Sequence, residues 1–216
     1  MTKFLFLRHA SSLSNMGEKF CGQTDVPLTE IGFEQAKDVC QYIYDNLKID
    51  LIYSSDLLRV RQTIAPLLEK IDLEPIFDKN LREIDVGSWA DKKVEEVKET
   101  DKQNFERYRA GDVSVVLGGK ESFDMVYDRA FKAINEIARK HDGKTILVAT
   151  HAGVIRMLIE KWLNIPDVEM RKTHDIGNAS ISEVDYDGEN VKVITISKND
   201  FLKNTTKERM IGKVFQ

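Results

Sequence analysis

Two histidines and two arginines in this chain stand where short apolar runs end. The run KFLFL is followed by Arg8 and His9, and the run TILVAT is followed by His151. Arg59 comes shortly after a third run, LIYSS. Guanidinium groups bind phosphate oxygens in a bidentate geometry, and an imidazole can act as a nucleophile or as an electrostatic partner. A pocket that holds these four side chains would suit the binding and transfer of a phosphoryl group.

The apolar runs before these residues are predicted strands of one sheet. The runs cover residues 3–7, 51–53 and 145–149, and each is followed along the chain by a segment with helical spacing. Alternating strands and helices predict an α/β fold, a three-layer sandwich with a largely parallel central sheet and helices on both faces. Ligands of such sheets bind at the carboxyl ends of the strands, beside helix N-termini that favour anions. The four side chains are therefore expected at one edge of the sheet.

Helix and hairpin signals fill the rest of the chain. Thr29 is predicted to cap one helix and Asp56 the next, in which Pro66 is expected to introduce a kink or an early end. The segments 179–184 and 191–196, joined across DGEN, are predicted to form a hairpin at the edge of the sheet. The predicted helices cover residues 28–47, 56–71, 122–140 and 154–163.

Length and composition limit the classes of protein. The chain has 216 residues, 42% of them hydrophobic, and a formal net charge of −4. A chain of this size is expected to form a single domain over residues 1–216, and its charge gives no electrostatic footprint for nucleic acid. No apolar run approaches the roughly 20 residues that span a bilayer, and no secretory signal is recognised. We therefore expect a cytoplasmic protein that binds neither nucleic acid nor membrane and keeps Cys21 and Cys40 reduced.

Each of the candidate residues also has a structural interpretation. Arg8 could be a strand-end charge that reaches solvent, and Arg59 could solvate a helix face. His9 alone would be interpreted as a hydrogen-bonded histidine at a strand end, but its pairing with His151 at an equivalent strand end favours a functional role. The other two histidines are interpreted as structural or surface residues: His141 and His174.

Six ordered sequence blocks resemble the histidine phosphatase superfamily, also called the phosphoglycerate mutase-like family. The blocks are LRHASSLSN, GQTDVPLTEIG, SSDLLRVRQT, LREIDVGSW, GGKES and VATHAGVIR, and together they extend across nearly the whole chain. Any single block is a weak signal, but the ordered set is highly specific. The resemblance implies an enzyme that hydrolyses phosphomonoesters through a phosphohistidine intermediate, with no metal and no cofactor.

The resemblance also implies a role for each residue that matches a block. It implies that His9 is the nucleophile and that Arg8, Arg59 and His151 form the pocket that holds the phosphoryl group. Asn15, at the end of the first block, is implied as a further phosphate contact.

The remaining implied site residues concern the leaving group and the substrate. Glu83 occupies the position of the acid that protonates the leaving oxygen, although the local sequence alone does not distinguish it from Asp85. Gln23 and Thr24 are where the family often places residues that line the substrate entrance. Ser12 keeps the hydroxyl of the usual threonine and is implied to contact the phosphate or substrate.

Two positions depart from the family pattern. Ala10 and Ser11 stand where the family usually has glycine and then an acidic residue or glutamine. Alanine can replace glycine where the backbone needs no positive φ, so we expect activity to survive. Ser11 is shorter than the usual polar residue, which leaves the substrate preference open.

The short segment before GGKES and the block LREIDVGSW resemble the phosphatase branch of the superfamily. Residues 90–120 are predicted to form a small helical lid insertion, whose basic residues are candidates for binding an anionic substrate: Lys92, Lys93, Arg107 and Arg109. The predicted function is metal-independent hydrolysis of a small phosphorylated metabolite. The alternatives are a cofactor-dependent phosphoglycerate mutase and a catalytically silent module that binds a phospholigand.

The C-terminal tail, residues 199–216, extends beyond the last predicted strand and carries scattered apolar residues. Three arrangements stay open for it: docking on its own domain, covering a sheet edge, or contacting a second subunit in a homodimer.

Overall fold

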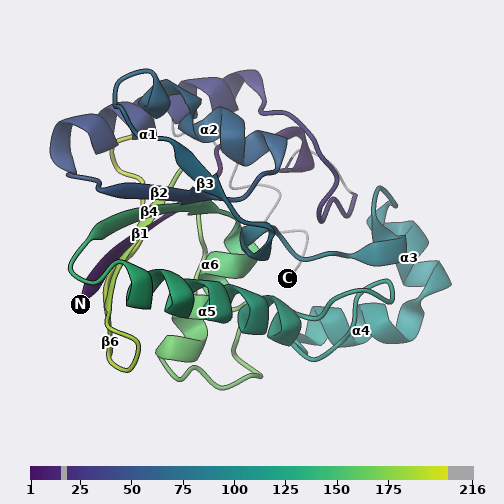
Figure 1. Ribbon diagram of the computed structural model, residues 1–216. Coiled ribbons are helices and arrows are strands. Elements are labelled where there is room, and N and C mark those ends of the chain that lie inside the picture. The colour runs from purple at the N-terminus through teal and green to yellow at the C-terminus, as the bar shows by residue number, and fades with distance from the viewer. Residues whose placement is uncertain (16–18, 204–216) are drawn as a thin grey trace.

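A six-stranded mixed sheet forms the centre of the computed structural model, which describes residues 1–15 and 19–203 (Figure 1). The strand order is β3-β2-β4-β1-β5-β6. The first four strands run parallel to their neighbours, while β5 is antiparallel to β1 and β6 to β5, which confirms the largely parallel sheet and its edge hairpin. The strands are β1 (Thr2–Arg8), β2 (Leu51–Ser54), β3 (Pro75–Phe77), β4 (Thr145–Thr150), β5 (Ile181–Tyr186) and β6 (Val191–Lys198).

Helices cover both faces of the sheet, as the sequence predicts for a three-layer α/β fold. In Figure 1, α1 and α2 lie above the sheet, α5 and α6 lie below it, and α3 and α4 lie beyond its end. None of the helices in the described ranges is long and apolar enough to cross a membrane. The helices are α1 (Glu30–Asn46), α2 (Leu58–Leu68), α3 (Val94–Thr100), α4 (Lys102–Ala110), α5 (Phe123–Lys140) and α6 (Ala152–Trp162), with short 3-10 helices at Leu13–Asn15, Lys79–Leu81 and Gly87–Trp89.

Strand β1 is apolar on both sides because each of its faces is covered by helices. Phe4 and Phe6 belong to the hydrophobic cluster that packs against α5 and α6, whereas Leu5 and Leu7 belong to the cluster under α1 and α2. Alternate residues of a strand point to opposite faces, so a central strand with two covered faces reads as a continuous apolar run.

The predicted caps of two successive helices have different outcomes. The Thr29 side chain accepts a hydrogen bond from the Gly32 backbone N–H at 3.0 Å, which confirms it as the cap of α1. The prediction that Asp56 caps α2 is wrong, because its carboxylate pairs with the Arg82 guanidinium through two hydrogen bonds of 2.6 Å. Such a charge-assisted bidentate pair is stronger than a cap. The loop residue Asp25 instead accepts the hydrogen bond from the first helical N–H of α2 at 2.6 Å.

Two further outcomes concern the end of α2 and the edge strand β3. Helix α2 ends at Leu68, shortly after Pro66, which confirms the expected early end. The edge strand β3 was not predicted, because three residues that begin with proline carry no alternating pattern.

The described start of the C-terminal tail packs on the body of the protein. The ring of Phe201 stacks on Tyr42 of α1 with centroids 4.3 Å apart, and Leu202 is buried. The remaining apolar residues of the tail, from Met210 onward, lie outside the described residues.

A close backbone approach in the first turn of α1 generates the first prediction. A Cβ atom added at Gly32 would lie 1.9 Å from the carbonyl oxygen of Ser11, so the backbone would have to shift. We expect Gly32→Ala to lower the free energy of unfolding, measured by urea denaturation, by about 2 kcal/mol or more. Lys37→Ala, at an exposed position of the same helix, should change it by less than about 0.5 kcal/mol. Equal effects of the two substitutions would contradict this packing.

Candidate active site

The parallel pairing of β1 with β4 brings the two histidines together. Arg8 is the register partner of Thr150, and the His9 backbone N–H donates to the carbonyl of Thr150 at 3.0 Å. His9 and His151 are therefore the first residues beyond the paired strands. Their rings lie with centroids 5.2 Å apart at an interplanar angle of 62°.

The His9 ring is held in one tautomer. Its Nδ1 lies 2.8 Å from the backbone carbonyl of Ala10, and because a carbonyl only accepts hydrogen bonds, Nδ1 must carry the proton. The Nε2 atom then keeps its lone pair. Burial, together with the positive charges of Arg8 and Arg59, lowers the pKa of His9 well below its usual value. The ring is therefore a neutral imidazole near pH 7.

The two arginines are fixed by backbone carbonyls rather than by carboxylates. Arg59 is 1% exposed, and it donates to the carbonyls of Gly22 at 2.9 Å and Thr24 at 3.0 Å. Arg8 donates to the carbonyl of Ile176. Burial lowers the pKa of both arginines, and that of Arg8 falls to about 10. Their charges are thus desolvated and remain uncompensated by these contacts.

Each of the residues Arg8, Arg59 and His151 has a buried nitrogen atom with no hydrogen-bond partner among the described residues: Nε of Arg8, Nε of Arg59 and Nδ1 of His151. The other ring nitrogen of His151 lies 2.8 Å from the hydroxyl of Ser55, and burial lowers the pKa of this histidine too. Buried polar nitrogens normally have a partner, so this set indicates a ligand rich in acceptor oxygens.

A cavity of about 240 Å³ opens beside Arg8, His9 and Arg59, whereas His151 is fully buried and does not line it. Five of the residues singled out in the sequence line it: Arg8, His9, Asn15, Arg59 and Glu83. The amide oxygen of Asn15 accepts hydrogen bonds from the Ser12 backbone at 3.0 Å and from Asn178 at 3.1 Å. The amide nitrogen of Asn15 is therefore the group that can donate to a ligand.

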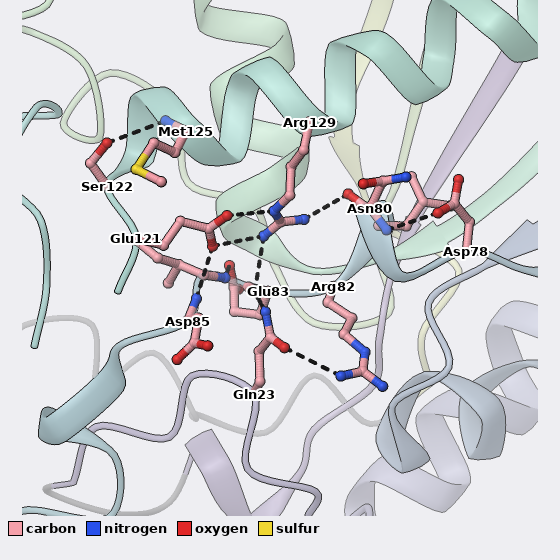
Figure 2. A network of polar contacts seen from close by, with 12 residues as sticks. Gln23, Asp78, Asn80, Arg82, Glu83, Asp85, Glu121, Ser122, Met125 and Arg129 are labelled. Carbon is pink, nitrogen blue, oxygen red and sulfur yellow. Dashed lines mark hydrogen bonds and ion pairs between the residues drawn. The ribbon is translucent and has the colours of Figure 1, made fainter. Parts of the chain in front are cut away.

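The carboxylate of Glu83 is oriented by two backbone N–H groups. Ile84 donates to one of its oxygens at 3.0 Å, and Gly153, in the first turn of α6, donates to the other at 3.2 Å. Figure 2 shows that Gln23 and Arg129 both donate to the backbone carbonyl of Glu83, each at 3.0 Å. The cavity wall thus holds this carboxylate in a fixed position.

The rival acid, Asp85, serves the turn that follows. Its carboxylate accepts a hydrogen bond from the Gly87 backbone at 2.9 Å, and its own N–H donates to Glu121, which in turn pairs with Arg129 (Figure 2). Asp85 does not line the cavity. The geometry therefore distinguishes two acids that the local sequence could not.

Three residues expected to contact the substrate do not line the cavity: Ser12, Gln23 and Thr24. Ser12 is buried, and its hydroxyl contacts Ser14 and Asn15. Gln23 supports Glu83 as described above, and the hydroxyl of Thr24 donates to Asp91 at 3.3 Å. The described residues of this loop that line the cavity are instead Phe20, Cys21 and Gly22.

Neither departure from the family pattern changes the cavity wall. Ala10 has no positive φ, and its N–H donates to Thr63 at 2.9 Å, so the backbone there accepts alanine. Ser11 is fully buried and contacts Gln35 and Thr29 on the side of α1. The structure thus places the shortened side chain away from the cavity.

The basic residues expected to face the substrate are not those that line the cavity. Lys92, Lys93, Arg107 and Arg109 do not contribute to its described wall, whereas Arg156 and Arg171 do. Arg156 is the last residue of the block VATHAGVIR and lies on the predicted helix, so helical spacing could have identified it. Arg171 lies in the loop before β5, where no periodicity was available.

Comparison with known proteins agrees with this geometry. The pattern of the histidine phosphatase superfamily (branch 1) matches residues 4–199. The chain is 32% identical over 182 residues to phosphoglycerate mutase-like protein 4 of Arabidopsis thaliana, covering 83% of this chain and 77% of that protein. It is also 32% identical over 186 residues to phosphoserine phosphatase 1 of Hydrogenobacter thermophilus, covering 85% of this chain and 86% of that protein.

Comparison with solved structures shows a shared fold. The solved structure of Bacillus stearothermophilus YhfR matches with a TM-score of 0.88 at 24% identity, over 94% of this chain and 100% of that one. This protein therefore belongs to the histidine phosphatase superfamily, and it is an enzyme of the histidine phosphatase class.

The burial of the paired histidines generates a prediction about their titration. Because burial lowers the pKa of His9 and His151, both rings should stay neutral as the pH falls through about 6.5, the usual imidazole value. In ring ¹⁵N NMR spectra of the ligand-free protein, we expect both titration midpoints well below that of a histidine in a model peptide. A midpoint of His9 at or above the peptide value would contradict the neutral nucleophile.

Proposed function

We propose that this enzyme hydrolyses a small phosphomonoester through a phosphohistidine on His9, without a metal ion. The observation that carries the proposal is the neutral His9 ring at the cavity, with Nδ1 held by a backbone carbonyl, beside three buried donors that have no partner among the described residues. A phosphoryl group would supply the acceptor oxygens that these donors need. The phosphoserine phosphatase of Hydrogenobacter thermophilus supports hydrolysis of a small metabolite.

The first step transfers the phosphoryl group to the protein. The lone pair of His9 Nε2 attacks phosphorus while the bond from phosphorus to the ester oxygen breaks. Arg8, Arg59 and His151 stabilise the charge on the phosphoryl oxygens, so catalysis depends mainly on positioning and electrostatics. The carboxyl group of Glu83 donates its proton to the leaving oxygen, and the alcohol departs.

The second step returns the enzyme to its starting state. A water molecule attacks the phosphorus of phosphohistidine, and the carboxylate of Glu83 now accepts a proton from that water. The bond between phosphorus and Nε2 breaks, its electron pair returns to His9, and inorganic phosphate leaves. Each proton taken up by Glu83 replaces the one that it gave in the first step.

The direct test is steady-state hydrolysis of a panel of phosphomonoesters, phosphoglycerates included, with EDTA present. We expect turnover by the wild type and a loss of about a thousandfold or more in His9→Ala, since the variant lacks the nucleophile. His141→Ala is the matched control. His141 lies at the C-terminal end of α5, where its ring contacts the Tyr53 hydroxyl of β2, and it does not line the cavity.

Other outcomes would contradict the proposal in different ways. Strong inhibition of the wild type by EDTA would contradict the metal-independent reaction, and substantial activity of His9→Ala would contradict the nucleophile. Transfer of the phosphoryl group between phosphoglycerates, in place of release of phosphate, would identify a mutase. Binding of phosphate esters without any turnover would identify a silent binding module.

The role of Glu83 predicts a dependence on the leaving group. Glu83→Gln should slow esters of aliphatic alcohols far more than p-nitrophenyl phosphate, whose phenolate needs little protonation to depart. We expect the difference between the two losses to be roughly 100-fold. Asp85→Asn is the matched control and should leave the ratio unchanged, because an amide oxygen can still accept from Gly87. Equal losses on both esters in Glu83→Gln would assign the acid elsewhere.

A further inference from the structure

Two arginines in the cavity wall have no role in the proposed phosphoryl transfer. Arg156 on α6 and Arg171 in the loop before β5 both line the cavity. The buried Nε atom of each has no hydrogen-bond partner among the described residues. Arg156 forms an ion pair with the exposed Asp175, with 3.8 Å between a terminal nitrogen of the guanidinium and a carboxylate oxygen. Both guanidinium groups therefore keep donors that a ligand can use.

The guanidinium of Arg171 contacts two aromatic rings. Its central carbon lies 4.2 Å from the ring centroid of Tyr108 on α4 and 4.4 Å from that of Phe123 at the start of α5. One of its terminal nitrogens donates to the backbone carbonyl of Tyr108 at 2.8 Å. These contacts and the hydrogen bond leave the Nε atom of Arg171 as a donor that an anion can use.

The backbone of Arg171 is also held in place. Its φ is +67°, a left-handed conformation that a residue other than glycine adopts only when its surroundings require it. The fully buried carboxylate of Glu160 accepts hydrogen bonds from the N–H of Arg171 at 2.7 Å and from that of His174 at 3.3 Å. Backbone conformations of this kind cluster at active sites and ligand-binding positions, and the side chain of Arg171 lines the cavity.

The charges around the cavity exceed what one phosphate can balance. The described wall contains four arginines, at positions 8, 59, 156 and 171, but Glu83 is its only acidic side chain. A phosphomonoester carries up to two negative charges, which the pair Arg8 and Arg59 can match. Arg156 and Arg171 are partly buried, and cations withdrawn from water are costly unless they are paired, so these two arginines favour a second anionic group.

We infer that Arg156 and Arg171 form a second anion subsite, and that the substrate is a small phosphomonoester that also carries a carboxylate. The phosphate half of this inference rests on the proposed function. A planar carboxylate matches the donor edge of a guanidinium, and it fits a cavity of about 240 Å³ that must also hold the phosphate. In this arrangement the second subsite selects the substrate, whereas the first performs the chemistry.

The test uses pairs of esters in which one member has a carboxylate and the other does not. Phosphoserine is compared with phosphoethanolamine, and 3-phosphoglycerate with glycerol 3-phosphate. We expect the wild type to prefer the carboxylate member of a pair in kcat/KM, and Arg171→Gln and Arg156→Gln to reduce that preference by roughly 10- to 100-fold. Arg107→Gln is the matched control, because it removes the same charge from α4 at a residue that pairs with Asp112 outside the cavity.

A merely structural role of Arg171 predicts a different result. If the side chain only joins α4 to α5, Arg171→Gln should lower the thermal unfolding temperature and reduce the turnover of both members of a pair equally. Arg171→Lys then serves as a second variant, since it keeps a charge for the carboxylate and should keep part of the preference. No preference by the wild type, or equal losses on both esters in all these variants, would overturn the subsite.

Binding measurements separate this inference from the proposed function. Calorimetric titration of the His9→Ala variant with phosphoserine and phosphoethanolamine reports the subsite even if no ester is turned over. Tighter binding of phosphoserine, lost on adding Arg171→Gln, would support the subsite whatever the reaction. Equal affinities for the two esters would overturn it. Tighter binding of 1,3-propanediol bisphosphate, in which a second phosphate stands in place of the carboxylate, would overturn it too.

Discussion

The register between β1 and β4 is the constraint on which the site depends. Because Arg8 lies opposite Thr150, the next residue of each strand is a histidine, and the two rings meet at the carboxyl edge of the sheet. A shift of either strand by one residue would turn its side chains to the opposite face and separate the rings. The two covered faces of β1 fix this register, since Phe4 and Leu5 each fill a different hydrophobic cluster. The apolar core and the catalytic geometry are thus consequences of one pairing.

The site combines a neutral imidazole with desolvated cations. Withdrawing guanidinium groups from water is costly, and an unpaired buried donor costs about 1–3 kcal/mol. Arg8, Arg59 and His151 each have such a buried nitrogen without a partner among the described residues. The same positive charges and burial keep His9 unprotonated, so its lone pair is available for attack. A phosphoryl group would satisfy the donors and neutralise the cations at once, which links ligand binding to the stability of this end of the sheet.

The sequence predicted those features that follow from local patterns. The apolar runs, the Thr29 cap and the ordered blocks identified the sheet and the residues at its edge, because periodicity and capping depend on neighbouring residues. The cap of α2 by Asp25 was not predictable, since it depends on a loop that folds against a distant helix. Likewise, the support of Glu83 by Arg129 and the position of Arg171 depend on contacts between distant segments. Ser12, Gln23 and Thr24 belong to matching blocks, but their hydrogen bonds orient the cavity wall from behind.

Trapping the phosphorylated enzyme tests the central claim most directly. The Glu83→Gln variant is mixed with p-nitrophenyl phosphate, which needs little acid assistance for the first step, while the loss of the base slows the attack of water in the second. After an alkaline quench, which preserves phosphohistidine, peptide mass spectrometry locates the phosphoryl group. The account predicts one phosphoryl group on His9, and none when His9→Ala is added. A phosphoryl group on another residue, or release of nitrophenol with no phosphorylated protein at any time point, would contradict it.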